Sequence, residues 1–386
     1  MSMSIDEVEQ QRERRAGYPL RLDGLRALAA REAGFGQRLR EHILPAVVRA
    51  SGELPEPPAP HEAGTAATTA LPRAQAAACV ARILMGDLPR REGAMCDVDG
   101  GPLLASTAPQ ELAKLRCILQ YFDRIADEAP RGTVEIRRLA GAPHAWDGDE
   151  SPLQPLEVRA SGAIEDADGC VQIDFANAYL GGGVLSGGCV QEEIRFAVSP
   201  ELLAGLAVSP RMGPHEAIVL HGAERFATTR GYAGSLRYGG DFRDPCARAA
   251  DGTPDVTVCA IDAIDYRRAG KASQYSESSI RRELDKARIG FTRDGHGGAP
   301  RDVASGNWGC GVFLGDPAQK AVIQWLAASA EGRALRYYTF GDARVGDLAA
   351  FARRAADRLG TVGAVARRLL GNPGIAGIAL YEHLTA

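Results

Sequence analysis

The sequence predicts an α/β fold, and three observations carry that prediction. Residues 171–176 alternate apolar and polar side chains, which is typical of a half-buried strand. Leu112, Leu115, Leu119 and Phe122 recur at steps of three and four, which gives a helix one apolar face. Strand and helix patterns then alternate through the second half of the chain, and such alternation favours a layered α/β domain.

The first 140 residues are predicted to be mostly helical. Residues 1–50 are rich in arginine and are expected to form one or two helices. Four prolines between positions 55 and 60 interrupt regular structure, and small or polar residues follow up to position 70, so a loop is expected there. Helical patterns return over residues 73–84 and 110–126.

A change of character between Pro143 and Pro155 is the predicted domain boundary, because this stretch combines prolines, Gly148 and several acidic residues. We expect three parts: a helical and partly disordered extension at 1–62, a helical accessory domain at 63–150 and an α/β domain at 151–386.

Within the α/β part, short apolar runs predict further strands at 194–198, 218–220, 256–264 and 335–340. Helices are expected between them, and one of these, around residues 280–287, is predicted to end at Gly290. A second has Asp316 as its N-cap and Pro317 at its first position, and a third covers residues 348–359.

Composition and charge limit the possible functions. The 386 residues are 45% hydrophobic and 24% charged, as in an ordinary globular protein, and they exceed what one small core needs. The formal net charge of -4 argues against a general nucleic-acid binder, which would present a broad basic surface. Any polyanionic ligand must therefore be held by local groups.

Cysteine and histidine usage predicts neither a metal site nor a cofactor. The eight cysteines form no CxxC pair and the seven histidines are scattered. No run of about eighteen apolar residues and no N-terminal signal segment is present, so neither a membrane span nor export is expected. We expect reduced, mostly buried thiols in an intracellular protein, which would be cytoplasmic, or nuclear in a eukaryote.

The strongest candidate motif is a triple glycine, Gly181-Gly182-Gly183, followed by Gln191-Glu192-Glu193. Glycines let backbone N–H groups approach a ligand, and adjacent carboxylates can supply a proton and then take one from water. The pair of motifs suggests a phosphate-bearing sugar held by backbone and cleaved by an acid. Alone, the glycines can equally be a flexible turn and the glutamates a solvated helix start.

Several sequence blocks share one resemblance. Asp174-Phe-Ala-Asn177 precedes the triple glycine, SGNWGCGVFLGD begins at Ser305, and RYYTFGD begins at Arg336. Together with the Gln-Glu-Glu motif, these blocks resemble the poly(ADP-ribose) glycohydrolases of the larger, animal-type form over roughly residues 70–386. The resemblance implies a macrodomain, a mixed sheet flanked by helices, preceded by a helical accessory domain.

The same resemblance implies an activity and a set of partners. The family hydrolyses the ribose–ribose glycosidic bonds of poly(ADP-ribose) and releases mainly ADP-ribose, with no cofactor or metal. The expected partners are poly(ADP-ribose) and ADP-ribosylated proteins, without direct nucleic-acid or membrane binding, and the protein is expected to be a monomer. A non-catalytic ADP-ribose-binding macrodomain and a mono-ADP-ribose hydrolase are the alternatives, and the glutamate pair argues against both.

Residue roles follow by position from the resemblance. Glu193 is the expected acid and then base, Glu192 is expected to bind ribose hydroxyls, and Asp174 and Asn177 are expected to contact the distal ribose and the catalytic loop. The predicted substrate-binding set comprises Gly181, Gly182, Gly183, Gln191, Tyr232, Asn307, Gly309, Cys310, Gly311, Phe313, Phe340, Ile164 and Glu165.

The glycine-rich loop at 306–313 is expected to wrap a diphosphate with backbone N–H groups, aided by the dipole of the helix predicted to begin at Pro317. Tyr232 and Phe340 match the aromatic positions that the family places against the adenine and the distal ribose. Leu314 departs from the family, which usually shows a second glycine there, and this puts the width of the loop in question.

Overall fold

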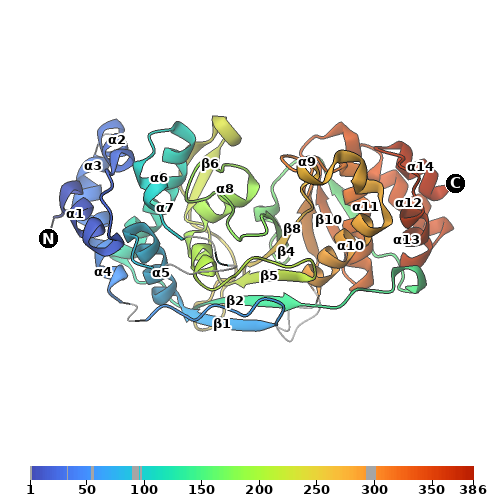
Figure 1. The fold of residues 1–386 in the computed structure, drawn as a ribbon, viewed down its shortest axis with the longest axis horizontal. Coiled ribbons are helices and arrows are strands. Elements are labelled where there is room, and N and C mark those ends of the chain that lie inside the picture. The colour runs from blue at the N-terminus through green and yellow to red at the C-terminus, as the bar shows by residue number, and fades with distance from the viewer. Residues whose placement is uncertain (1, 33, 54–55, 89–94, 96–97, 293–300) are drawn as a thin grey trace.

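The computed structural model describes residues 2–32, 34–53, 56–88, 95, 98–292 and 301–386. Figure 1 shows helices from the first part of the chain at one end and helices from the last part at the other. A sheet joins the two groups, and the chain termini lie at opposite ends of the molecule.

One mixed sheet of eight strands organises the described chain. Its order is β1-β2-β5-β8-β4-β9-β10-β3. The pairs from β1 to β8 are antiparallel and the pairs from β8 to β3 are parallel. In that order the strands span Ala67–Pro72, Thr133–Ala140, Glu216–His221, Thr257–Asp262, Val171–Ala176, Val303–Gly306, Leu335–Tyr338 and Leu156–Arg159. A separate hairpin pairs β6 (Ala227–Arg230) with β7 (Arg237–Asp241).

The strands predicted around 171–176, 218–220, 256–264 and 335–340 are confirmed as β4, β5, β8 and β10. The strand predicted at 194–198 is wrong, because these residues belong to helix α8 (Gln191–Val198). This run of residues is too short for the spacing of its apolar side chains to distinguish a helix from a strand. Arg195 through Val198 are all buried, so the segment has no exposed strand face. The Glu193 carboxylate also accepts a hydrogen bond from the Val190 N–H, which caps the first turn of the helix.

Helices and two strands make up the first 140 residues. The helical elements are α1 (Ile5–Ala16), α2 (Asp23–Arg31), α3 (Phe35–Arg38), a π-helical turn (Leu39–Ile43), α4 (Leu44–Ser51), α5 (Arg73–Met85), α6 (Gly101–Ala105) and α7 (Pro109–Asp127). The predictions for α5 and α7 are confirmed, whereas the N-terminal region holds more helices than expected. The loop expected up to residue 70 is wrong from Ala67 onward, because β1 and β2 extend the sheet into this part of the chain.

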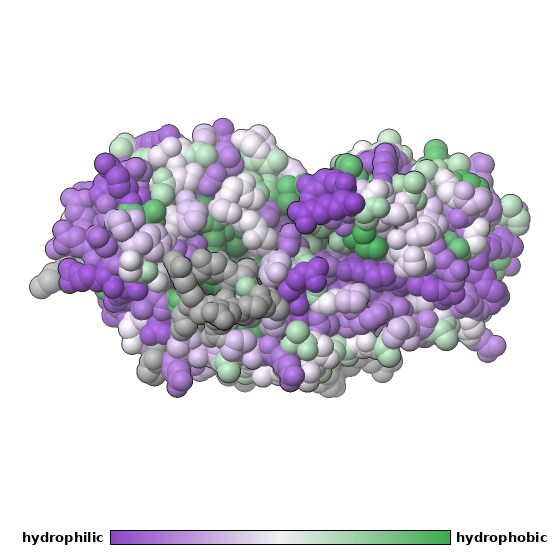
Figure 2. All heavy atoms as spheres, viewed as in Figure 1, coloured by the Kyte–Doolittle hydropathy of each residue, from purple (hydrophilic) through white to green (hydrophobic). Residues whose placement is uncertain are grey.

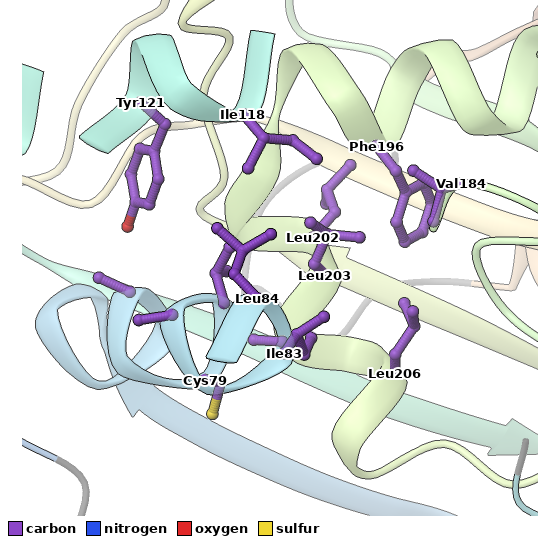
Figure 3. Close-up of a cluster of buried hydrophobic side chains, with 14 of the residues drawn as sticks. Cys79, Ile83, Leu84, Ile118, Tyr121, Val184, Phe196, Leu202, Leu203 and Leu206 are labelled. Atoms are coloured by element: carbon purple, nitrogen blue, oxygen red, sulfur yellow. The ribbon is translucent and has the colours of Figure 1, made fainter. Parts of the chain in front are cut away.

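The first hydrophobic core joins this helical part to the sheet. Figure 3 shows Leu84 of α5 pointing toward Ile118 and Tyr121 of α7, with Ile83 beside it, whereas the Cys79 side chain points away from α7. The other wall is formed by Phe196 of α8, by leucines of the 3-10 helix Pro200–Ala207 and by Val184 of the loop before α8. Because Val184 is fully buried in this cluster, the triple-glycine loop is anchored in the same core as the accessory helices.

The remaining helices lie at the other part of the sheet, where all of them except α9 contribute to a second hydrophobic core. They are α9 (Tyr266–Ala269), α10 (Glu277–Phe291), α11 (Pro317–Ala330), α12 (Leu348–Arg358), α13 (Val362–Leu370) and α14 (Ala379–Thr385). Asp316 is confirmed as the N-cap of α11, since its carboxylate accepts from Ala318 and Gln319. The prediction that Gly290 ends its helix is wrong, because Gly290 lies inside the last turn of α10.

The surface carries no large apolar face in the view of Figure 2, where hydrophobic residues form small, separated groups among hydrophilic ones. Across the described residues, no helix has both the length and the apolar character to cross a membrane. Six of the seven described cysteines are buried, which agrees with the expectation of mostly buried thiols.

Gly290 gives a test of helix-on-sheet packing. A Cβ at this position would lie 2.6 Å from Ile261 Cγ2 and 3.1 Å from Cys259 Sγ of β8. The Gly290→Ala substitution improves helix propensity by about 1 kcal/mol. The steric clash costs about 1–3 kcal/mol, so we expect net destabilisation in chemical denaturation, with exposed Ser278→Ala in the same helix as the control. Unchanged or raised stability would contradict the tight α10–β8 contact.

Candidate active site

A cavity of about 810 Å³ opens where the loops after β4, β9 and β10 meet the hairpin β6–β7. The parallel strands β4, β9 and β10 point their carboxyl ends at it, and this is where α/β sheets present ligand groups. The predicted residues that line the cavity are Ile164, Glu165, Gln191, Tyr232, Asn307, Gly309, Cys310, Gly311, Phe313 and Phe340. Residues from the Gln-Glu-Glu motif and from the blocks that begin at Ser305 and Arg336 therefore meet at one site.

The loop between β4 and α8 holds both candidate glutamates by their oxygens. Glu192 accepts from the N–H of Asn177 (2.8 Å) and from that of Gly181 (2.7 Å). Glu193 accepts from Gly183 N–H (2.9 Å) through Oε1 and from Val190 N–H (2.8 Å) through Oε2. Backbone donors therefore fix the direction of each carboxylate.

Clearance explains why this loop needs glycine. A Cβ on Gly182 would lie 2.5 Å from a Glu193 oxygen and 2.6 Å from a Glu192 oxygen. A Cβ on Gly188 would lie 2.6 Å from Glu193 Oε1. Gly181 and Gly182 also have φ angles of 82° and 51°, which side chains disfavour. The glycines let the chain wrap closely around two carboxylates.

This arrangement differs from the first expectation for the triple glycine. The N–H groups of Gly181 and Gly183 bind the glutamates instead of facing a ligand, and Gly182 N–H donates to Tyr179. None of the three glycines lines the cavity, nor do Asp174, Asn177, Glu192 or Glu193.

The two glutamates and Asp174 differ in exposure. Asp174 is 0% exposed, Glu192 is 2% exposed and Glu193 is 7% exposed. Glu193 Oε2 also lies 2.8 Å from the nitrogen of Val190, which lines the cavity, so this carboxylate is at the inner edge of the cavity wall. Of the three acids, Glu193 is the one that a ligand can approach most easily.

Gln191 joins the start of α8 to the end of β4. Its amide oxygen accepts from Phe175 N–H (2.8 Å), and its amide nitrogen donates to the Ile173 carbonyl (3.2 Å). The side chain therefore continues the hydrogen bonding of the strand edge, and it also lines the cavity. This pairing fixes where the two glutamates lie relative to the sheet.

Asp174 and Glu192 form a buried acidic pair. Burial raises the pKa of Asp174 well above its usual range, and the nearby Glu193 carboxylate adds to that effect. Burial likewise raises the pKa of Glu192, followed by its proximity to Asp174 and Glu193. Neither Asp174 oxygen has a hydrogen bond of ordinary geometry among the described residues, so the Arg195 charge and the contact with Glu192 offset the loss of water only in part.

Lys114 holds the same loop from the accessory helix α7. Its ammonium donates to the carbonyls of Ser186 (2.6 Å), Val184 (3.1 Å), Gly183 (3.2 Å) and Gly188. The side chain is fully buried, and burial lowers its pKa while Cys189 and Glu193 act in the opposite direction. Its position on a helical face gave no sequence signal for this role.

The glycine-rich loop after β9 forms the opposite wall. Asn307 accepts from the Tyr337 hydroxyl (2.8 Å), and a Cβ on Gly309 would lie 2.5 Å from Ala263 Cβ. A Cβ on Gly311 would meet nothing within 4 Å, so this position is open. Leu314 adopts a φ of 60°, a conformation that glycine usually supplies, and its side chain is exposed.

The expected dipole contribution of α11 is not supported. The first free N–H groups of the helix, those of Ala318 and Gln319, donate to the Asp316 carboxylate. No residue from Leu314 to Gln319 lines the cavity. The N-terminus of this helix is therefore satisfied by the protein itself.

Aromatic side chains line the cavity from several elements. Tyr232 is 54% exposed at the tip of the β6–β7 hairpin, and Phe340 is 52% exposed after β10. Phe340 adopts a φ of 52° and stacks on Tyr338 with ring centroids 6.4 Å apart. Exposed aromatic faces in a concave site are suited to a planar base or a sugar face.

Other lining residues were not predicted, and they are Phe175, Val190, Ile194, Thr229, Gly231, Ala233, Val312 and Arg344. Most are apolar or small neighbours of predicted residues, and nothing in their residue type separates them from core positions. Within the described ranges, no group of three or more His, Cys, Asp or Glu side chains is arranged to hold a metal ion.

We expect Lys114→Met to loosen the triple-glycine loop. The substitution leaves several buried carbonyls without a donor, and each such group costs about 1–3 kcal/mol. Stability should fall, and hydrogen exchange of the Gly181, Gly183 and Val190 amides should accelerate. Lys271→Met, at an exposed lysine, is the matched control. Unchanged exchange in the loop would contradict the role of Lys114.

Asp174→Asn tests the buried acid through pH. An acid whose folded pKa is raised binds more protons folded than unfolded, so its stabilising effect exists at low pH and is lost as pH rises toward the folded pKa. In the parent, the free energy of unfolding therefore falls by about 1.4 kcal/mol for each pH unit between the unfolded and the folded pKa of Asp174. Relative to the parent, D174N should gain stability from pH 5 to pH 8 in denaturant titrations. A constant difference between the two proteins would show that Asp174 is not protonated in the fold.

Family models match two parts of this chain. The model described as poly(ADP-ribose) glycohydrolase, macro domain fold, matches residues 143–347, and the model for the helical domain matches residues 36–138. The first match covers more than half of the chain and includes the glycine loop, the glutamates and most of the cavity wall.

Individual relatives agree with these models. Poly(ADP-ribose) glycohydrolase 1 of Arabidopsis thaliana is 36% identical over 310 residues, covering 62% of this chain and 56% of the relative. Poly(ADP-ribose) glycohydrolase 2 of Caenorhabditis elegans is 34% identical over 289 residues, covering 69% and 57%. A solved poly(ADP-ribose) glycohydrolase of Thermomonospora curvata, bound to the inhibitor ADP-HPD, is 26% identical with a TM-score of 0.37, covering 52% and 79%.

The chain spans about half the length of the curated relatives it matches. The expected fold, a macrodomain-like sheet with a helical part before it, is confirmed by the two family models and by the eight-stranded mixed sheet. The chain belongs to the poly(ADP-ribose) glycohydrolase family.

Proposed function

We propose that this protein hydrolyses the ribose–ribose glycosidic bonds of poly(ADP-ribose), with Glu193 as the general acid and base. The observation that carries the proposal is the position of Glu193. Its carboxylate is fixed by the Gly183 and Val190 N–H groups at the inner edge of an 810 Å³ cavity, which is large enough for a nucleotide sugar.

The chemistry requires one mobile proton. The leaving group is a ribose hydroxyl, which departs poorly as an alkoxide, so a carboxylic acid protonates its oxygen as the bond breaks. The anomeric carbon gains oxocarbenium character, and water attacks it while giving a proton to the same carboxylate. In this proposal Glu193 first donates and then accepts that proton.

The neighbouring acids support this step without taking part in proton transfer. Glu192 is more deeply buried than Glu193, and backbone N–H groups bind both of its oxygens. We assign it to holding the loop geometry, with ribose hydroxyls as its ligands where they reach it. Burial raises the pKa of Glu192, and the nearby Asp174 adds to that effect.

The remaining walls suit the rest of ADP-ribose. Tyr232 and Phe340 offer exposed ring faces for the adenine and the distal ribose, and Glu165 and Ile164 lie beside them for the base edge. The loop lines the cavity at Gly309 and Gly311, and its open position at Gly311 offers backbone to the diphosphate. We further propose that the protein acts as an intracellular monomer on polymer attached to proteins.

Glu193→Gln is the direct test. The amide keeps the size of the side chain but cannot supply the proton, so hydrolysis of labelled poly(ADP-ribose) should fall by at least about 100-fold, the usual contribution of acid–base catalysis. Binding of ADP-ribose, measured by calorimetry, should change little. The products of the parent reaction should resolve by size as ADP-ribose, in the absence of added metal.

Glu277→Gln is the matched control, because Glu277 also lies in the first turn of a helix, on the exposed start of α10. Its activity should equal that of the parent. If E193Q retains the parental rate, Glu193 is not the acid. If the parent binds ADP-ribose but leaves the polymer intact, the protein is a binding module instead of a glycohydrolase.

A further inference from the structure

Arg344 is the one lysine or arginine among the described residues that line the cavity. It lies in the 3-10 turn Ala343–Val345, in the segment that follows β10, four residues beyond Phe340. The proposed ligand carries two phosphates, and a cavity wall of this size with one cation makes that cation the main source of charge complementarity.

Asp342 orients the Arg344 guanidinium. Nε lies 2.9 Å from Asp342 Oδ1, and Nη2 lies 2.6 Å from Oδ2. An arginine has five N–H donors, and this fork uses only the Nε and Nη2 side. Nη1 has no hydrogen-bond partner among the described residues, so its donors are free for a ligand.

The same carboxylate connects Arg344 to the glycine-rich loop. Asn307 Nδ2 donates to Asp342 Oδ2 at 3.2 Å, and Asn307 lines the cavity. The charge of Arg344 also acts on a residue of this loop. Burial raises the pKa of the Cys310 thiol to about 12, and the positive charges of Lys320 and Arg344 counteract this rise. Arg344 therefore lies close enough to act on a group bound by this loop.

The other nearby cation cannot serve the ligand directly. Lys320 lies beneath the loop, is 1% exposed and has its ammonium 2.9 Å from Glu283 and 3.8 Å from the centre of the Trp308 ring. It is enclosed on the protein side and does not line the cavity. The side chain of Arg344, by contrast, is 60% exposed.

We propose that Arg344 is a further substrate-binding residue that binds the diphosphate of ADP-ribose beside the glycine-rich loop of Gly309 and Gly311. This inference rests on the proposed function for its ligand. It adds an ionic contact to a subsite for which the sequence predicted backbone donors alone, and Asp342 acts as its positioning residue.

The experiment compares ligands that differ in phosphate. Calorimetry measures binding of adenosine, ADP and ADP-ribose to the parent, Arg344→Gln, Arg344→Lys and the control Arg353→Gln, an exposed arginine on α12. Arg344→Gln should weaken ADP and ADP-ribose by about five- to tenfold and leave adenosine unchanged, since a solvent-exposed charged hydrogen bond is worth roughly this much. Arg344→Lys should show a smaller loss than Arg344→Gln, and the control Arg353→Gln should bind all three ligands like the parent.

Salt provides a second measurement. The affinity of the parent for ADP-ribose should fall as ionic strength rises, and R344Q should show a shallower dependence. Equal ADP-ribose affinity in parent and R344Q would overturn the assignment of Arg344 and leave the proposed function intact. Equal weakening of all three ligands would also overturn it, because that pattern indicates a distorted cavity. If the parent binds ADP and ADP-ribose no more tightly than adenosine, both proposals are overturned.

Discussion

The contact between the Lys114 ammonium and the carbonyls of the triple-glycine loop supports the whole site. The loop turns its N–H groups inward to two carboxylates, so its carbonyls point away and need donors of their own. A buried cation meets that need and also offsets the negative charge of the glutamates. Because Lys114 comes from α7, the accessory helices take part in building the site as well as covering the sheet.

Glycine serves two purposes around the cavity. In the loop before α8 it removes the Cβ atoms that would collide with Glu192 and Glu193, so that backbone donors can surround both. In the loop after β9 it leaves backbone open toward the cavity at Gly311. The two loops look alike as sequence, yet one binds the protein's own carboxylates and the other faces the space where a ligand would lie.

Electrostatics divides the site into a buried acidic side and an exposed mixed side. Asp174 and Glu192 are enclosed, and loss of water raises the pKa of each. Glu193 stands between them and the cavity, where backbone donors orient it. On the exposed side Arg344 supplies positive charge to the cavity wall, and the net charge of -4 is compatible with anion binding because this charge acts locally.

The sequence alone determined the α/β class, the position of β4, α7 and the α11 cap, and the glycine and glutamate motifs, because these depend on local periodicity and residue type. It could not separate helix from strand at 194–198, since five residues fit both periods and the capping contact of Glu193 decides between them. Strands β1 and β2 needed tertiary pairing, as each is stabilised by a distant neighbour in the sheet. Only the tertiary structure decided the roles of Lys114 and Arg344, because the role of a charged side chain depends on the groups that the fold brings to it. The carbonyls that Lys114 binds lie about seventy residues away in the sequence. Arg344 is connected through Asp342 to Asn307, which lies on the loop after a different strand.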